Sequence, residues 1–130
     1  MSHDYVTDTM ALILRLEKRK LSQKVRTIFE AVEKGKISLK IPAMVLAEIG
    51  YLSERNKIDT NLNEVQDYCQ KFPAVTIEPI TAKIIYRSFE IDDIPELHDR
   101  IIAGTASLKN LELITNDPMI IKSKYVSTIW

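Results

Sequence analysis

The sequence contains little glycine and proline, one cysteine and no long apolar run. Three glycines, five prolines and a single cysteine occur among 130 residues. Cys69 has no partner for a disulfide within the chain, so a reducing compartment is expected. No apolar run reaches the roughly 18 residues that cross a bilayer, and the segment from Met1 to Asp8 is polar, unlike a secretory signal. We therefore expect a cytoplasmic protein without membrane attachment.

The chain also lacks an excess of charge of either sign. Its 18 Lys and Arg balance its 18 Asp and Glu, which argues against a protein that binds nucleic acid through bulk charge. The distribution is uneven, because six basic residues and one acid lie between Arg15 and Arg26, while the segment from Glu90 to Asp99 has five acids and no Lys or Arg. Two interpretations remain open: a polyanion held beside a metal site, or two solvated surfaces.

Short β-like runs alternate with longer helical ones along the chain. We expect strands at 5–7, 37–41, 74–77, 111–115 and 126–130, and helices at 8–16, 22–35, 42–56, 62–72, 81–89 and 97–110. Ser22 should cap the second helix, Gly35 should close it, and Pro42 suits the first turn of the third. Strands separated by helices predict a single α/β domain over residues 1–130, with three layers (α/β/α) and a mainly parallel sheet of four to five strands.

Two aspartates follow directly after expected strands. Asp8 follows the first strand, and Asp117 follows the fourth in the segment Leu-Ile-Thr-Asn-Asp-Pro. Ligands of parallel sheets gather at the carboxyl ends of the strands, so both carboxylates lie on one rim if these strands are neighbours. Each also has a structural explanation, because Asp is a good helix N-cap and Asp117-Pro118 fits an N-cap followed by the first helical residue.

Two further acids lie on apolar helices. Glu48 is the only charged residue in the segment 41–52, which we expect to be largely buried. A buried, unpaired carboxylate costs on the order of several kcal/mol, so Glu48 should be paired or bound to a metal. Asp99 precedes the apolar segment 101–106, whose small residues around Gly104 allow another element to approach closely. The alternatives are a salt bridge or an exposed position for Glu48, and a favourable acid in a first helical turn for Asp99.

The combination of Asp8, Glu48, Asp99 and Asp117 is more informative than any member. Four carboxylates on one rim would repel one another, and without a cation some would stay protonated. Mg²⁺ or Mn²⁺ suits such oxygen ligands, and the lack of a Cys/His cluster argues against zinc. One or two such ions would orient and activate water and stabilise the charge on a phosphodiester during cleavage.

These segments resemble the PIN domain family and, within it, the VapC-type toxins. The resemblance extends from Tyr5 to Trp130 and depends on the order and spacing of four short pieces: Tyr-Val-Thr-Asp-Thr at 5–9, the segment 41–49 from Ile-Pro-Ala to Ala-Glu-Ile, Leu-His-Asp-Arg-Ile-Ile-Ala-Gly-Thr-Ala at 97–106, and Leu-Ile-Thr-Asn-Asp at 113–117. It implies an α/β/α fold and a Mg²⁺- or Mn²⁺-dependent endoribonuclease, the toxin of a type II toxin–antitoxin pair, which cleaves RNA and is inhibited by a small antitoxin protein.

The resemblance also implies roles for individual residues. By motif position, Asp8 and Asp99 correspond to the principal metal ligands, and Glu48 and Asp117 complete the acidic site directly or through water. Thr115 and Asn116 correspond to groups that orient these carboxylates. Gly104 departs from the family pattern, where many relatives carry Ala, and this change should not affect the chemistry.

The resemblance further suggests a homodimer face or an antitoxin groove. Apolar residues of the first two helices, such as Leu12, Leu16, Ile28 and Val32, are candidates for either surface. The alternative is that these side chains simply form the core of one chain.

Other enzyme classes fit less well. A phosphatase of the haloacid dehalogenase type needs a second Asp two residues after Asp8, where this chain has Met10. A Walker-type site needs a glycine-rich loop, which is absent. Ser-His-Asp hydrolysis is unsupported, since the histidines are His3 and His98 and we expect His98 to be an orienting or surface residue. The remaining alternative is a catalytically silent PIN-fold module that binds RNA or protein, against which the intact set of four acids argues.

Overall fold

A computed structural model describes residues 4–130, so His3 lies outside the described part. The elements in chain order are β1 (Asp4–Thr7), α1 (Thr9–Leu16), α2 (Gln23–Glu33), β2 (Ser38–Pro42), α3 (Ala43–Glu54), α4 (Leu62–Lys71), β3 (Val75–Glu78), α5 (Ala82–Glu90), α6 (Leu97–Lys109), β4 (Glu112–Ile114), α7 (Pro118–Ile121) and β5 (Thr128–Ile129). Within residues 4–130, none of the helices has the length and apolar character needed to cross a bilayer.

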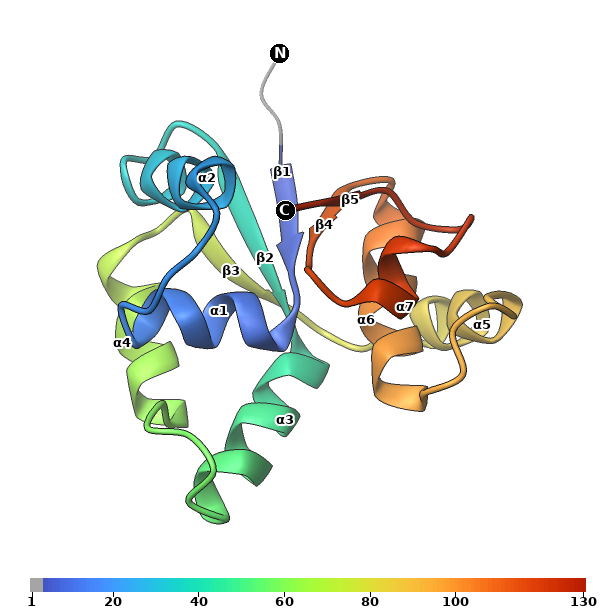
Figure 1. The fold of residues 1–130 in the computed structure, drawn as a ribbon, viewed down its shortest axis with the longest axis horizontal. Helices are drawn as coiled ribbons and strands as arrows, with labels where there is room; N and C mark the ends of the chain where they lie inside the picture. Colours follow the sequence, from blue (N-terminus) through green and yellow to red (C-terminus); the bar gives the residue numbers. More distant parts are fainter. Residues whose placement is uncertain (1–3) are drawn as a thin grey trace.

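The five strands form one sheet in the order β3-β2-β1-β4-β5. Every neighbouring pair is parallel, so the predicted α/β fold with a mainly parallel sheet is confirmed. In Figure 1, α1, α2 and α4 lie on one side of the sheet and α5, α6 and α7 lie on the other. The carboxyl ends of the strands point to the lower edge in this view, where α1 and α3 begin.

Local sequence signals explain most helix boundaries. The Ser22 hydroxyl accepts a hydrogen bond from the backbone N–H of Val25 at 3.1 Å, which makes Ser22 the predicted N-cap of α2. Gly35 follows this helix with φ +75°, a conformation that glycine adopts readily. The expectation for Pro42 was wrong. Its ψ of 140° is extended, and it ends β2, pairs with Glu78 and occupies the N-cap position before α3 instead of lying in the first helical turn.

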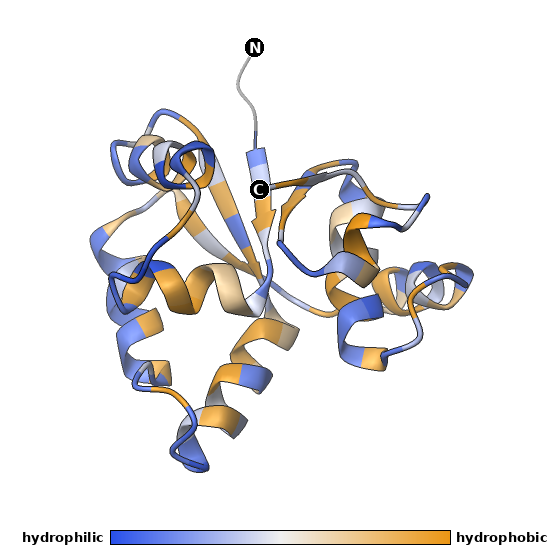
Figure 2. Cartoon of the chain, viewed as in Figure 1, coloured by the Kyte–Doolittle hydropathy of each residue, from blue (hydrophilic) through white to orange (hydrophobic). Residues whose placement is uncertain are grey.

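The apolar side chains of the first two helices belong to the core. Leu12 and Val32 are completely buried, and Ile28 is almost so. They pack with the strands, where Figure 2 shows hydrophobic residues concentrated. These three side chains are therefore not available to a partner, because the faces of α1 and α2 that carry them cover the sheet. The fourth candidate, Leu16, is only half-buried and lines a cavity beside α4.

Close packing of α5 against α6 depends on Gly104. A Cβ atom at this position would overlap the Ser88 hydroxyl and would lie 3.1 Å from the Ser88 Cα atom. Ser88 is itself completely buried and donates to the Ile84 carbonyl at 2.6 Å. The predicted role of the small residues around Gly104, close approach of another element, is confirmed.

We expect Gly104→Ala to destabilise the protein. Overpacking against Ser88 costs about 1–3 kcal/mol, which outweighs the gain of about 1 kcal/mol for Ala over Gly in a helix. Thermal melting should show a lower Tm. Gly50→Ala is the matched control, because its Cβ would meet only the flexible end of Leu62, at 3.2 Å. An equal or higher Tm for Gly104→Ala than for Gly50→Ala would contradict this account.

Candidate metal centre

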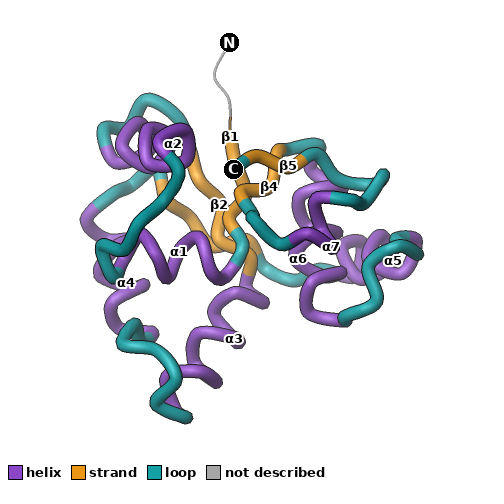
Figure 3. The backbone as a smooth tube through the Cα atoms, in the orientation of Figure 1, coloured by secondary structure: helices purple, strands orange, loops and turns teal. Residues whose placement is uncertain are grey.

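The candidate site lies where the strand order of the sheet reverses. From β1 the chain continues outward to β2 and β3, whereas β4 and β5 lie on the other side of β1. In open parallel sheets this reversal leaves a crevice at the carboxyl ends of the two central strands, where ligands bind. The loops after β1 and β4 leave the sheet here (Figure 3), joined by a hydrogen bond of 3.1 Å from the Asp8 N–H to the Ile114 carbonyl.

Asp8 is the residue that directly follows β1 at this point of the sheet. Its side chain is only 7% exposed, and one carboxylate oxygen accepts a hydrogen bond of 2.8 Å from the Ala11 N–H, so Asp8 also caps α1. Burial raises the pKa of Asp8 to about 6, and the charges of Asp117 and Glu48 act in the same direction. Hydrogen bonds from Thr115 and Ala11 oppose the shift but do not cancel it. Asp8 is thus both a helix cap and a carboxylate whose ionised form is disfavoured by burial and by nearby negative charge.

Asp99 lies in the first turn of α6, where the helix dipole favours a negative charge. Its pKa is nevertheless raised to about 6, first by burial and then by the charges of Glu96, Asp117, Glu48 and Asp8. The repulsion from these carboxylates and the loss of water therefore exceed the benefit of the helix terminus. A favourable first-turn acid does not explain this environment.

Glu48 is held in place from two sides. Thr9, the first residue of α1, donates its hydroxyl hydrogen to one carboxylate oxygen of Glu48. The Nδ1 atom of His98 lies 3.7 Å from the other oxygen and 3.3 Å from Glu96. Among residues 4–130 no Lys or Arg forms a salt bridge with Glu48. The simple alternative of a Lys or Arg partner is therefore wrong.

Thr115 connects the two aspartates that follow β1 and β4. It is completely buried, its side chain hydrogen-bonds to the Asp8 carboxylate, and its oxygen accepts the Asp117 N–H at 3.1 Å. Asp117 is the predicted N-cap of α7, with Pro118 as the next residue, and accepts the Met119 N–H at 2.9 Å. Asn116 is exposed, and within the described chain no hydrogen bond of its side chain is found.

The structure therefore brings Asp8, Glu48, Asp99 and Asp117 close enough together that their charges raise the pKa of Asp8 and of Asp99. In the sequence these four residues are up to 109 positions apart. Their function as metal ligands stays a prediction. Sequence reasoning assigned no role to Thr9 or Glu96. Thr9 was visible as the residue after Asp8, but only the fold places its hydroxyl at Glu48. The ligand atoms of Glu48, Glu96 and His98 lie within 4.8 Å of one another at the rim.

The expectation that α3 is largely buried was wrong. Only Val45 and Ile49 are buried, while Ala47 and Tyr51 are exposed. Figure 2 shows hydrophobic residues over several turns of α3, so this helix has a core face and a second apolar face. Glu48 is partly buried at the border of the second face, which explains how a carboxylate is accommodated on so apolar a helix.

The comparisons with known proteins agree with this architecture. The family model described as "PIN domain" matches residues 5–124. A search of curated proteins found no match.

Among solved structures, the chain is similar to a chain of VapBC2 from Rickettsia felis bound to a promoter DNA fragment, with a TM-score of 0.75, 20% identity and 98% of both chains covered. It is similar to a chain of DNA-bound VapBC from Salmonella typhimurium, with a TM-score of 0.73 and 15% identity. This likeness covers 99% of this chain and 98% of the VapBC chain. It is also similar to the toxin VapC20 from Mycobacterium tuberculosis, which is described as cleaving the Sarcin-Ricin loop. Here the TM-score is 0.62 and the identity 14%, with 89% of this chain and 92% of the VapC20 chain covered. These likenesses establish the fold.

The raised pKa values predict that the metal-free protein loses stability as the pH rises from about 5 to about 7.5. Asp8 and Asp99 have a pKa of about 6 when folded and ordinary values when unfolded, so the folded state binds more protons between these values. Their stabilising effect is complete below the unfolded pKa and is lost as the pH passes 6. Glu17, Glu33 and Asp93 have lowered pKa values, so their contribution is lost only at more acidic pH.

Thermal melting in EDTA should therefore show a Tm that falls by roughly a few degrees across this interval. The double variant Asp8→Asn with Asp99→Asn should flatten the slope. A slope that is unchanged in the double variant would show that other groups cause the pH dependence.

Proposed function

This chain belongs to the PIN domain family, and we propose that it is a metal-dependent endoribonuclease that acts in the cytoplasm as the toxin of a toxin–antitoxin pair. The observation that carries the proposal is the group of four carboxylates around the crevice between β1 and β4, two of which have a pKa of about 6. Uncompensated charge of this kind is expected at a site that binds a cation.

The donor set fits a hard divalent cation. All four side chains offer oxygen, which Mg²⁺ and Mn²⁺ prefer, and a bound cation would remove the repulsion that raises the pKa of Asp8 and Asp99. We propose Asp8 and Asp99 as the principal ligands, with Glu48 and Asp117 binding directly or through water. When bound, the metal supplies an activated water and stabilises negative charge on the phosphodiester.

The surrounding residues hold this donor set in place. Thr115 fixes the Asp8 carboxylate and the backbone of Asp117, and Thr9 fixes one oxygen of Glu48. Preorganised ligands are valuable because they do not need to reorient when charge develops during the reaction. We propose Thr115 as a positioning residue of the site, and Asn116 as a group that contributes only after metal or RNA binds.

Asp99→Asn should abolish cleavage of a mixed-sequence RNA in the presence of Mg²⁺ or Mn²⁺, by orders of magnitude. The change preserves the size of the side chain and removes a charge that the metal needs. In EDTA the variant should melt at the same temperature as the wild type or higher, because repulsion is relieved. Asp67→Asn is the matched control, because Asp67 is exposed on α4, and it should cleave normally.

Two results would count against the proposal. Undiminished cleavage by well-folded Asp99→Asn would make the four acids structural. A wild-type protein that binds RNA but never cleaves it with either metal would support the catalytically silent PIN-fold module instead.

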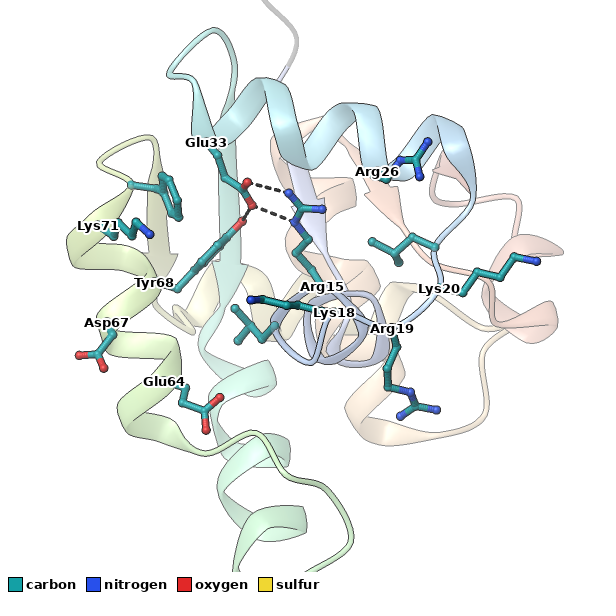
Figure 4. A pocket seen from close by; sticks show the side chains of 13 residues that line it. Arg15, Lys18, Arg19, Lys20, Arg26, Glu33, Glu64, Asp67, Tyr68 and Lys71 are labelled. Atoms are coloured by element: carbon teal, nitrogen blue, oxygen red, sulfur yellow. Dashed lines mark hydrogen bonds and ion pairs between the residues drawn. The ribbon is translucent and has the colours of Figure 1, made fainter.

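For the antitoxin we propose a site on α1, α2 and α4. A cavity of about 780 Å³ lies on this side. Arg15 is held at its wall by hydrogen bonds of 2.9 and 2.7 Å to Glu33, which also accepts a hydrogen bond from Tyr68 (Figure 4). Lys18, Lys20, Arg26 and Lys71 line the same cavity and have no ion pair among the described residues. Six cations and three acids, Glu33, Glu64 and Asp67, line the cavity together with apolar side chains. This excess of positive charge suits an acidic segment of a partner protein.

The double variant Lys20→Glu with Arg26→Glu should weaken binding of the antitoxin, which we expect to be a small protein encoded beside this gene, by about tenfold or more. The loss should shrink at high salt. Calorimetry of the purified pair would measure it. Lys57→Glu, an exposed lysine outside the cavity, is the control. Equal affinity for the double variant and the control would place the partner elsewhere.

Homodimerisation is also proposed, through apolar side chains that remain exposed. Tyr86 and Phe89 on α5 and Leu97 on α6 are large and solvent-accessible, and they lie outside the core that covers the sheet. Exposed apolar groups of this size are typical of interfaces. Sedimentation of the purified protein measures its oligomeric state directly.

A further inference from the structure

A hollow of about 440 Å³ lies beside the candidate metal centre and is lined by Met44, Ala47, Glu48, Tyr51, Leu52 and His98. All of these except His98 come from α3, at spacings that place them on one face of the helix. This is the second apolar face, distinct from the one that buries Val45 and Ile49. Glu48 belongs both to the hollow and to the carboxylate group, so a molecule in the hollow contacts the edge of the metal centre.

The hollow contains an exposed aromatic ring next to a cation. Tyr51 is 55% exposed, and the guanidinium carbon of Arg55 lies 4.5 Å from the centre of its ring. In the described part of the chain, Arg55 forms no ion pair with a carboxylate. Proteins that bind single-stranded nucleic acids combine these same two features, aromatic rings that stack on bases and cations that attract phosphates.

We propose that this hollow holds an unpaired base of the RNA substrate, next to the phosphodiester that is cleaved, and that Tyr51 is the surface on which the base stacks. This inference rests on the proposed ribonuclease activity. The volume lies within the range of about 300–1,000 Å³ that is usual for small-molecule sites. Because a base and its phosphates are joined through one sugar, a base in the hollow brings a phosphate close to Glu48.

The polar groups at the rim favour a base over an apolar side chain of a partner protein. The Glu48 carboxylate accepts hydrogen bonds, which the amino groups of bases supply. His98, whose Nδ1 atom lies 3.7 Å from a Glu48 oxygen, offers a second polar group beside it. An aliphatic side chain would desolvate both groups without a replacement bond. Since a base inside a double helix has both faces stacked on its neighbours, the substrate must be single-stranded at this nucleotide.

Binding can be measured without cleavage. In an Asp99→Asn background with EDTA, fluorescence anisotropy of a labelled, unstructured RNA oligomer should show that Tyr51→Ala raises Kd by about tenfold. Tyr51→Leu, which keeps apolar bulk, should lose the same affinity. Tyr51→Phe and Tyr51→Trp should bind as before, because both rings stack. Leu108→Ala is the control, because Leu108 is 41% exposed on α6 and lies outside the hollow.

Several outcomes would overturn the inference. These are an unchanged Kd for Tyr51→Ala, an equal loss for Tyr51→Phe, equal affinity for a fully paired hairpin, and no measurable binding of RNA. Sedimentation showing that Tyr51→Ala converts a dimer into a monomer would assign the hollow to a second copy of the chain. Failure of the proposed function is seen separately, as wild-type protein that does not cleave RNA with Mg²⁺ or Mn²⁺ while the Tyr51 effect on binding persists.

Discussion

The parallel pairing of β1 with β4 is the constraint on which the candidate site depends. Thr7 lies beside Ile114 in this pairing, so the two chain segments that carry Asp8 and Asp117 leave the sheet together. Thr115 is buried at the junction and contacts both aspartates through hydrogen bonds. If β4 instead paired at an outer strand, these carboxylates would be moved apart by at least one further strand spacing, roughly 5 Å, and they would no longer share the reversal point of the sheet.

The site concentrates negative charge at some cost to stability. Asp8 and Asp99 are partly deprived of water, and each lies near further carboxylates, so their ionised forms are disfavoured. Elsewhere the chain pairs its buried charges, as Arg15, Glu33 and Tyr68 do between α1, α2 and α4. The charges of Arg15 and Glu33 are thus balanced by hydrogen-bond partners, whereas the charges of Asp8 and Asp99 are not balanced by a cation among the described residues. This contrast marks the carboxylate group as the candidate functional site.

The helix α3 connects packing to recognition. Val45 and Ile49 attach it to the core, and the neighbouring face presents Glu48 to the carboxylate group and Tyr51 to the hollow. One rigid element thus positions a proposed metal ligand and a proposed stacking surface relative to each other. Sites built on helices hold their geometry more precisely than sites on loops, which suits a reaction that requires the bond and the metal to be aligned.

The sequence by itself determined where the helices and strands lie and which acids are candidates for the site. Periodicity and caps such as Ser22 located the helices, and acids after two strands, together with Glu48 on an apolar helix, identified the candidate site. These signals are local, so they can be read without the fold. Only the tertiary structure decided that Leu12 and Val32 form the core, that Tyr51 remains exposed, and that Thr9 reaches Glu48 across 39 positions. Each depends on which faces of α1 and α3 meet, and periodicity shows that a face is apolar without showing what covers it.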